Sequence, residues 1–350
     1  MALNMRVSTA MAAVARAKTR VREGCAARRL TRATLRAARA EGAAVTPRTC
    51  HHALMPGSLV MTPPDPPLRD PTVIAAFRGW NDAASAASTT IATIAAQRHA
   101  DQIGTVDPEE FYDFQVTRPI IDLTGDDPGL TWPEVEIMAA RCPDADRDLV
   151  LVVGGEPSMR WPTFCRLLLD AVEALGARRF VTLGALLADV PHTRDVALTV
   201  MTTQEGLVEG MDTRPPGYRG PTGIVGVLHL LAADRGLEAV SLWAPTSHYA
   251  AGMVNHKAEL ALIEGVAAVT GVPIDTTAVR ANAREFEEQV DQVVAGDPRL
   301  QQLVEQLEQA TDEDGPVEFE EDDLPSGDDL VAELERFLRE RQDPPPPQGI

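Results

Sequence analysis

Four side chains that can do acid–base or metal chemistry follow apolar segments of this sequence: Glu156, Asp189, His192 and His248. Carboxylates and imidazoles held together can transfer protons or bind a metal ion. None of the four shows a local ligand spacing such as His-x-x-x-His. The ordinary alternative is that they cap helices and tie loops together at the ends of strands. The pattern leaves both interpretations open, and no metal is expected.

A second candidate is the segment 220–223, Gly-Pro-Thr-Gly, directly before a helical pattern. Free backbone N–H groups at a helix start can bind an anion, and Thr222 adds a hydroxyl. Pro221, however, removes one donor, and proline in the first turn of a helix is common without any ligand. The sequence contains no Walker A loop, Rossmann glycine fingerprint or Gly-x-Ser-x-Gly elbow. We therefore assign no catalytic residue and expect no cofactor.

Strands must position these candidates. Four short apolar runs predict buried strands, at 71–77, 149–153, 179–184 and 239–243. Helical patterns separate them, which predicts an α/β fold with a three-layer, mostly parallel sheet. Each run is followed by polar candidates, namely Asn81 and Asp82, Glu156, Asp189 and His192, and His248 and Tyr249. Ligands bind outside the carboxyl ends of parallel strands, so we expect these side chains to share one edge of the sheet.

Aromatic residues gather beside the same loops, although the chain has only 15 of them. Such a concentration indicates a lined pocket or an interface; the alternative is that large rings simply fill space at the ends of the sheet. Asn81 and Asp82 are most simply a helix cap. The candidate pocket that results consists of Trp80, Asn81, Asp82, Glu156, Arg160, Trp161, Asp189, His192, Thr222, His248 and Tyr249.

Composition excludes some classes of function. The 350 residues are 44% hydrophobic and 24% charged, which is enough for a sizeable core. A formal net charge of −20 argues against general nucleic-acid binding. No apolar stretch approaches the roughly 18–20 residues that cross a bilayer. Four cysteines without a C-x-x-C pair, and no evident secretory signal, predict a cytoplasmic protein.

The two ends of the sequence differ from its middle. Residues 1–50 carry eleven Arg or Lys against two acids, which is typical of a targeting segment, a disordered extension, or a start codon assigned before Met55 or Met61. Residues 312–329 hold ten acids and predict a solvated linker. We expect five segments: a basic, then Pro-rich extension at 1–67, an α/β domain at 68–275, a helical segment at 276–311, an acidic linker at 312–328, and a C-terminal helix with a Pro-rich tail at 329–350.

Six stretches of the sequence resemble the PAC2 family, named for proteasome assembly chaperone 2, in its actinobacterial branch. They begin with Phe-Arg-Gly-Trp-Asn-Asp-Ala at 77–83 and continue at 111–119, 155–161, 184–193, 220–224 and 248–249. Several separate motifs in one order make the resemblance specific. It covers residues 68–275, with a weaker match through the C-terminal helix.

The resemblance implies a core similar to the phosphorylase/hydrolase-like fold and a homo-oligomer, with a trimer expected. Eukaryotic relatives help to assemble the proteasome α-ring, which implies a proteasome-related partner. Some archaeal relatives dock on the proteasome through a C-terminal hydrophobic-Tyr-X tail. This chain ends Pro347-Gln348-Gly349-Ile350, so docking through such a tail is not expected.

Two functional classes follow. The first, which we favour, is a non-catalytic assembly or interaction protein that works as an oligomer. The second is a small-molecule-binding protein or enzyme that uses the pocket at the strand ends, with carboxylate–amine ligase or nucleoside-type chemistry. The sequence offers no ATP-binding motif in support of a ligase.

Overall fold

The computed structural model describes residues 53–54, 59–123, 129–204, 206–208 and 219–314. The predicted basic segment 1–50 and the predicted C-terminal helix lie outside these ranges. The strands are β1 Ala53–Leu54, β2 Leu59–Met61, β3 Thr72–Arg78, β4 Asp101–Val106, β5 Ile120–Asp122, β6 Gly129–Thr131, β7 Val135–Ala140, β8 Leu149–Gly155, β9 Arg179–Ala188, β10 Thr199–Thr202 and β11 Glu238–Ser247. The helices are α3 Ala86–Gln97, α4 Trp161–Ala174, α5 Ile224–Asp234, α6 His256–Thr270, α7 Thr277–Ala295 and α8 Pro298–Asp314, with short 3₁₀ turns η1 Ala83–Ser85, η2 Pro108–Glu110 and η3 His248–Ala250.

Nine of the strands form one sheet in the order β1-β2-β4-β7-β8-β3-β9-β11-β10. Its four central strands, β8, β3, β9 and β11, are parallel. The strands that flank them on both sides pair antiparallel. The predicted α/β fold is confirmed, and the parallel part of the sheet is this central block.

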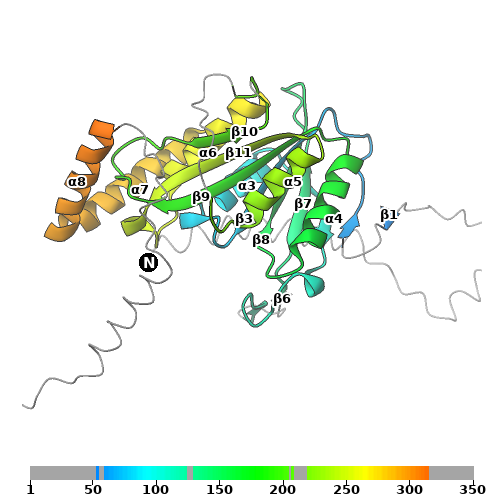
Figure 1. The fold of residues 1–350 in the computed structure, drawn as a ribbon, viewed down its shortest axis with the longest axis horizontal. Helices are drawn as coiled ribbons and strands as arrows, with labels where there is room; N and C mark the ends of the chain where they lie inside the picture. The colour runs from blue at the N-terminus through cyan, green and yellow to red at the C-terminus, as the bar shows by residue number, and fades with distance from the viewer. Residues whose placement is uncertain (1–52, 55–58, 124–128, 205, 209–218, 315–350) are drawn as a thin grey trace, which may run out of the picture. The chain divides into compact units, whose positions relative to one another are not determined.

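The central strands are apolar without alternation because helices cover both faces of the sheet. In β3, for example, the first six residues are all buried. Helices α4 and α5 pack on one face, where Phe164 meets Phe77 and Phe111 edge to face. Helices α3 and α6 pack on the other face through side chains such as Ile91 and Leu262. Figure 1 shows α4 and α5 in front of the strands and α3 behind them, so the predicted three layers are present.

Two further helices follow this core. Helix α7 packs on α6, and α8 packs on α7. A small apolar cluster joins them to η3: Ala250 from η3, Phe286, Val290 and Val294 from α7, and Val304 from α8. The predicted C-terminal helices are thus present, and α8 continues to Asp314, three residues into the segment 312–328 that the sequence predicts as a linker. None of the helices within the described residues is long and apolar enough to cross a membrane.

The stretch 111–123, which the alternation of large side chains predicts to be extended, is mostly not a strand. Residues 111–117 form turns, and only β5 is extended. Tyr112 is buried in the core, and its hydroxyl donates a hydrogen bond to the Gly155 carbonyl at 2.5 Å. Tyr112 thus packs at the end of β8, whereas Val116 of the same pattern is 77% exposed, so the alternation does not mark a strand here.

Candidate functional site

The four parallel strands end at one edge of the sheet, at Arg78, Gly155, Ala188 and Ser247. Their common direction follows from the registers of β3 with β8, β3 with β9, and β9 with β11. The loops that carry the predicted site residues therefore start from this edge, which we call the rim; the exception is the segment with Thr222, which follows the antiparallel strand β10. The structure brings some of these residues together in two separate groups and leaves the others apart.

The first group surrounds Glu156, which follows β8. One carboxylate oxygen, Oε1, accepts hydrogen bonds from Asn81 Nδ2 at 2.7 Å and from the backbone N–H of Ile224 at 2.8 Å. Ile224 is the first residue of α5, so the carboxylate lies at the positive end of that helix. The sequence left open whether this helix start binds an anion; in the structure the internal carboxylate of Glu156 lies there.

Asn81 fills the space beside this helix start. A Cβ placed on Gly223 would lie 2.2 Å from Asn81 Nδ2, so only glycine fits at that position. Asn81 is 1% exposed, and its Oδ1 has no hydrogen-bond partner among the described residues. Asn81 thus joins the end of β3 to the start of α5 through Glu156.

Asp82 lies next to Asn81 but faces a different helix. Its Oδ1 accepts hydrogen bonds from the backbone N–H groups of Ala87 at 2.8 Å and Ser88 at 3.1 Å. Burial raises the pKa of the Asp82 carboxyl, and the hydrogen bonds from Ser88 and Ala87 oppose that rise. Asp82 therefore caps the start of α3, which agrees with the prediction that it is a helix cap.

The backbone between Asp82 and α3 is strained. Ala84 and Ser85 both have positive φ angles, 51° and 55°, in the region that non-glycine residues rarely adopt. The Ala84 carbonyl accepts a hydrogen bond from the N–H of Asn255 at 3.1 Å, and Asn255 caps α6. This turn fixes the start of α3 against the start of α6.

The second group surrounds His192, in the loop after β9. Its Nδ1 lies 2.7 Å from the Tyr249 hydroxyl and its Nε2 lies 3.0 Å from Asp291 on α7. The backbone N–H of His192 also donates to the Tyr249 hydroxyl, at 2.8 Å. Burial raises the pKa of that hydroxyl, so it stays protonated. The chain Tyr249–His192–Asp291 resembles a proton relay, but the His192 side chain is only 1% exposed and both of its ring nitrogens are already engaged.

The remaining predicted residues lie around the rim without meeting in one place. Asp189 and His248 form an exposed pair at 3.1 Å. Arg160 pairs with Glu110 at 2.7 Å, and Trp80 is 66% exposed. The others make local contacts: Trp161 Nε1 donates to the Pro157 carbonyl at 2.6 Å, and Thr222 Oγ1 lies 3.4 Å from the Gly223 carbonyl.

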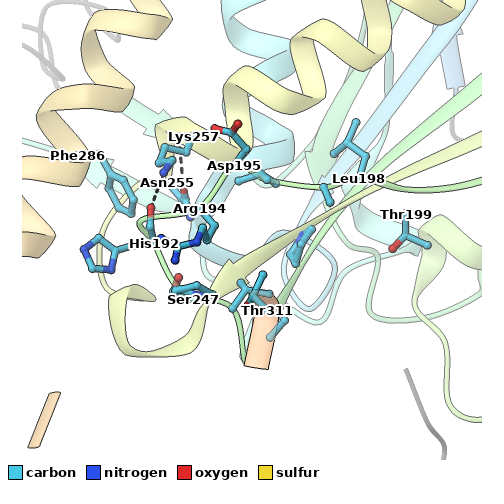
Figure 2. Close-up of a pocket in the computed structure, with 16 residues that line it drawn as sticks. His192, Arg194, Asp195, Leu198, Thr199, Ser247, Asn255, Lys257, Phe286 and Thr311 are labelled. Carbon is cyan, nitrogen blue, oxygen red and sulfur yellow. Dashed lines mark hydrogen bonds between the residues drawn. The ribbon is translucent and has the colours of Figure 1, made fainter. Parts of the chain in front are cut away.

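A pocket of about 150 Å³ lies beside the second group (Figure 2). The loop after β9, the end of β11, the start of α6 and single residues of α7 and α8 line it. His192 is the one predicted residue that lines it. Phe286 and Thr311 were missed because they come from helices far along the sequence, and no local pattern connects them to β9.

The two cations that line this pocket are already paired. Lys257 Nζ donates to the His192 carbonyl at 2.5 Å and lies 3.2 Å from Glu287. Arg194 pairs with Glu308 at 3.2 Å and with Asp312 at 2.8 Å. Much of the remaining lining is apolar, including Val190, Pro191, Val196, Leu198 and Phe286. The pocket therefore suits an apolar group better than an anion.

Within the residues that the structure describes, no three His, Cys, Asp or Glu side chains gather closely enough to hold a metal ion. Cys142 and Cys165 are free and buried. The carboxylates and imidazoles at the rim are instead engaged with helix starts and with each other.

Comparison with known proteins gives the family. The model of the PAC2 family matches residues 76–294. This chain belongs to the PAC2 family. A PAC2-family protein from Streptomyces avermitilis is 42% identical, with a TM-score of 0.63, and the match covers 67% of this chain and all of that one (100%). The Mycobacterium tuberculosis proteasome-assembly chaperone homologue Rv2125 is 39% identical, with a TM-score of 0.62, over 67% of this chain and 99% of that one.

A more distant structure shares the fold. The Pyrococcus furiosus protein PbaB, an archaeal proteasome activator, is 21% identical with a TM-score of 0.56, over 67% of this chain and 97% of that one. No curated protein matches this chain. In this PAC2-family chain the family match includes both rim groups and ends within α7. Helix α8, which contributes Thr311 to the pocket, follows the matched region.

Proposed function

We propose that this PAC2-family chain is a non-catalytic, cytoplasmic interaction protein that associates with itself and with proteasome-related subunits. One observation carries the proposal. Glu156, His192 and Asp82 are each bonded to another element of the same fold, and the other two candidates for chemistry, Asp189 and His248, pair with each other. A side chain that holds α3, α5 or α7 in place is not free to act on a substrate.

The relatives support the proteasome-related part. The 39% identical M. tuberculosis protein is described as a proteasome-assembly chaperone homologue, and this chain matches 99% of its length. The formal charge of −20 adds a preference for partners with basic surfaces. Association steered by charge weakens as salt screens it, so complex formation should slow at high ionic strength.

An assembly assay tests the proposal. Purified proteasome α subunits from the source organism are mixed with and without this chain, and ring formation is followed over time by native gel electrophoresis. We expect the chain to co-migrate with α subunits and to accelerate ring formation. A variant that keeps the fold but alters the rim, Glu156→Gln, should behave like the wild type. No co-migration and an unchanged rate would overturn the proposal.

The pocket in Figure 2 favours a second candidate function, the binding of a small molecule with an apolar body. Thermal-shift screening with nucleotides, nucleosides, amino acids and metal ions tests it. A ligand at about 100 times its Kd stabilises the folded state by about 2.7 kcal/mol. Leu198→Phe should abolish the shift by filling the pocket, whereas Leu187→Phe, exposed on β9 outside the pocket, should preserve it. An unchanged shift in Leu198→Phe would place the ligand elsewhere.

A further inference from the structure

The pocket beside the second group is small and largely apolar. Its volume is about 150 Å³, below the roughly 300–1,000 Å³ of sites that enclose a drug-sized ligand. Val196, Leu198 and Phe286 contribute to its apolar lining, and the two cations that line it are already paired. A pocket of this size and lining fits a large apolar side chain from a docked polypeptide segment.

A segment of this chain begins beside the pocket. Thr311 of α8 lines the pocket (Figure 2), and α8 ends at Asp314, three residues further on. Residues 315–350 follow and lie outside the described ranges. Fifteen residues separate Asp314 from Leu330, and a chain of that length reaches at most about 50 Å when extended. A short tether keeps the segment behind it at an effective concentration on the order of mM, so a modest affinity is enough for docking.

The sequence of that segment predicts a helix with one apolar face. Four of its apolar side chains follow one another at intervals of four, three and one residues, which places them on one side of a helix: Leu330, Leu334, Phe337 and Leu338. A helix of about ten residues is only marginally stable by itself in water. Its apolar face therefore needs a surface on which to pack.

We propose that residues 330–339 dock on the pocket of the same chain, with the side chain of Phe337 inside it. Phe337 is the largest apolar side chain of this segment. The inference goes beyond the proposed function, because it gives the pocket an occupant that belongs to the chain itself. A small molecule or a partner subunit then has to displace this segment before it can use the pocket.

The charges on the two sides agree with this docking. Asp195 lines the pocket, is exposed, and forms no ion pair within the described part of the chain. The side chain of Asp291, the partner of His192, is 60% exposed. The segment brings Arg336 and Arg339 at the end of its predicted helix. Opposite charges across a contact fix its orientation more than they add to its affinity.

Thiol labelling of the purified 350-residue chain tests the proposal. Leu198→Cys places a thiol in the pocket, and serine replaces both cysteines of the first fifty residues, so that the other thiols are the buried Cys142 and Cys165. The rate at which a maleimide modifies position 198 is measured by mass spectrometry of peptides. Modification of a covered site follows the population of the open form, so we expect Phe337→Asp to raise this rate roughly tenfold or more.

Two controls separate docking from a general effect of substitution. Ala332→Asp introduces the same charge on the opposite face of the predicted helix and should keep the slow rate. Leu230→Cys places the thiol on α5, at an exposed leucine outside the pocket. Its labelling rate should be the same with Phe337 and with Phe337→Asp, and circular dichroism checks that each variant folds.

Three results would overturn the proposal. The first is an equal labelling rate at position 198 with Phe337 and with Phe337→Asp. The second is an equal rise in rate for Ala332→Asp, because the protection would then not depend on the apolar face. The third is protection that disappears when the chain is diluted, which would place the segment of a second copy in the pocket. The test contains no proteasome subunit, so its failure is separate from a failure of the proposed function.

Discussion

Replacing Glu156 distinguishes a structural carboxylate from a catalytic one. In the wild type, Oε1 accepts one hydrogen bond from Asn81 and one from the first N–H of α5. Glu156→Ala removes both and leaves the 1% exposed Asn81 side chain without its partner. Glu156→Gln keeps a carbonyl oxygen at the same place and removes only the charge.

The two variants should therefore differ in magnitude. Hydrogen bonds to a charged acceptor contribute about 1.5–3 kcal/mol each. Because Glu156 is partly exposed and water can replace some of this, we expect Glu156→Ala to lower the free energy of unfolding by about 2–4 kcal/mol. Loss of a negative charge at a helix N-terminus lowers the free energy of unfolding by about 0.3–1 kcal/mol, and we expect this effect for Glu156→Gln.

Urea denaturation followed by far-UV circular dichroism measures both values. Glu305→Ala, at an exposed position on α8, is the control and should change stability by less than about 0.5 kcal/mol, as surface substitutions usually do. If Glu156→Ala and Glu156→Gln both unfold like the wild type, then Glu156 does not anchor α5. It would then be a free carboxylate, and the structural interpretation of the rim would be refuted.

Three further predictions concern the fold around the rim and the opposite end of the sheet. Gly223→Ala should lower the free energy of unfolding by about 2–3 kcal/mol, because the new Cβ would overlap Asn81. An unchanged urea midpoint of unfolding would contradict this packing. Burial pushes the pKa of the Asp148 carboxyl up, but hydrogen bonds from Arg69 and Cys142 outweigh it and hold that pKa below its ordinary value. Asp148→Asn should therefore lower the free energy of unfolding by about 2–4 kcal/mol at pH 7. The difference in stability from the wild type should shrink as the pH falls below about 4, where first the unfolded and then the folded carboxyl takes up a proton. A difference that stays the same between pH 7 and pH 3 would contradict this prediction. Ser85→Gly should stabilise the folded chain by about 0.5–1 kcal/mol, because glycine adopts the positive φ of that turn without strain. A lower melting temperature for this variant would contradict the claim that the turn is strained.

The sequence predicted the central sheet because its signals are local. Runs such as Leu149–Val153 are apolar at every position, which only a strand covered on both faces requires. The common edge of the loops then follows from the parallel direction of the strands. Asp82 as a helix cap was also a local interpretation, since a carboxylate directly before a helix is typical of caps.

The division of the rim into two groups could not be predicted in the same way. Glu156 bonds to the start of α5, 68 residues further on, and His192 bonds to Asp291 on α7, 99 residues further on. Those partners depend on how helices pack onto the finished sheet, and no spacing within the sequence encodes that. The extended stretch predicted around Tyr112 was wrong for a related reason, since Tyr112 bonds to Gly155 at the end of β8, 43 residues further on.

The central claim is that this PAC2-family chain acts by binding other subunits and not by turning over a substrate. Native mass spectrometry of the full-length chain co-expressed with the proteasome α subunits of its source organism tests that claim most directly. We predict masses that contain both proteins, and the same masses for Glu156→Gln. Spectra that show this chain only by itself, together with a bound small molecule that changes chemically during incubation, would contradict the account.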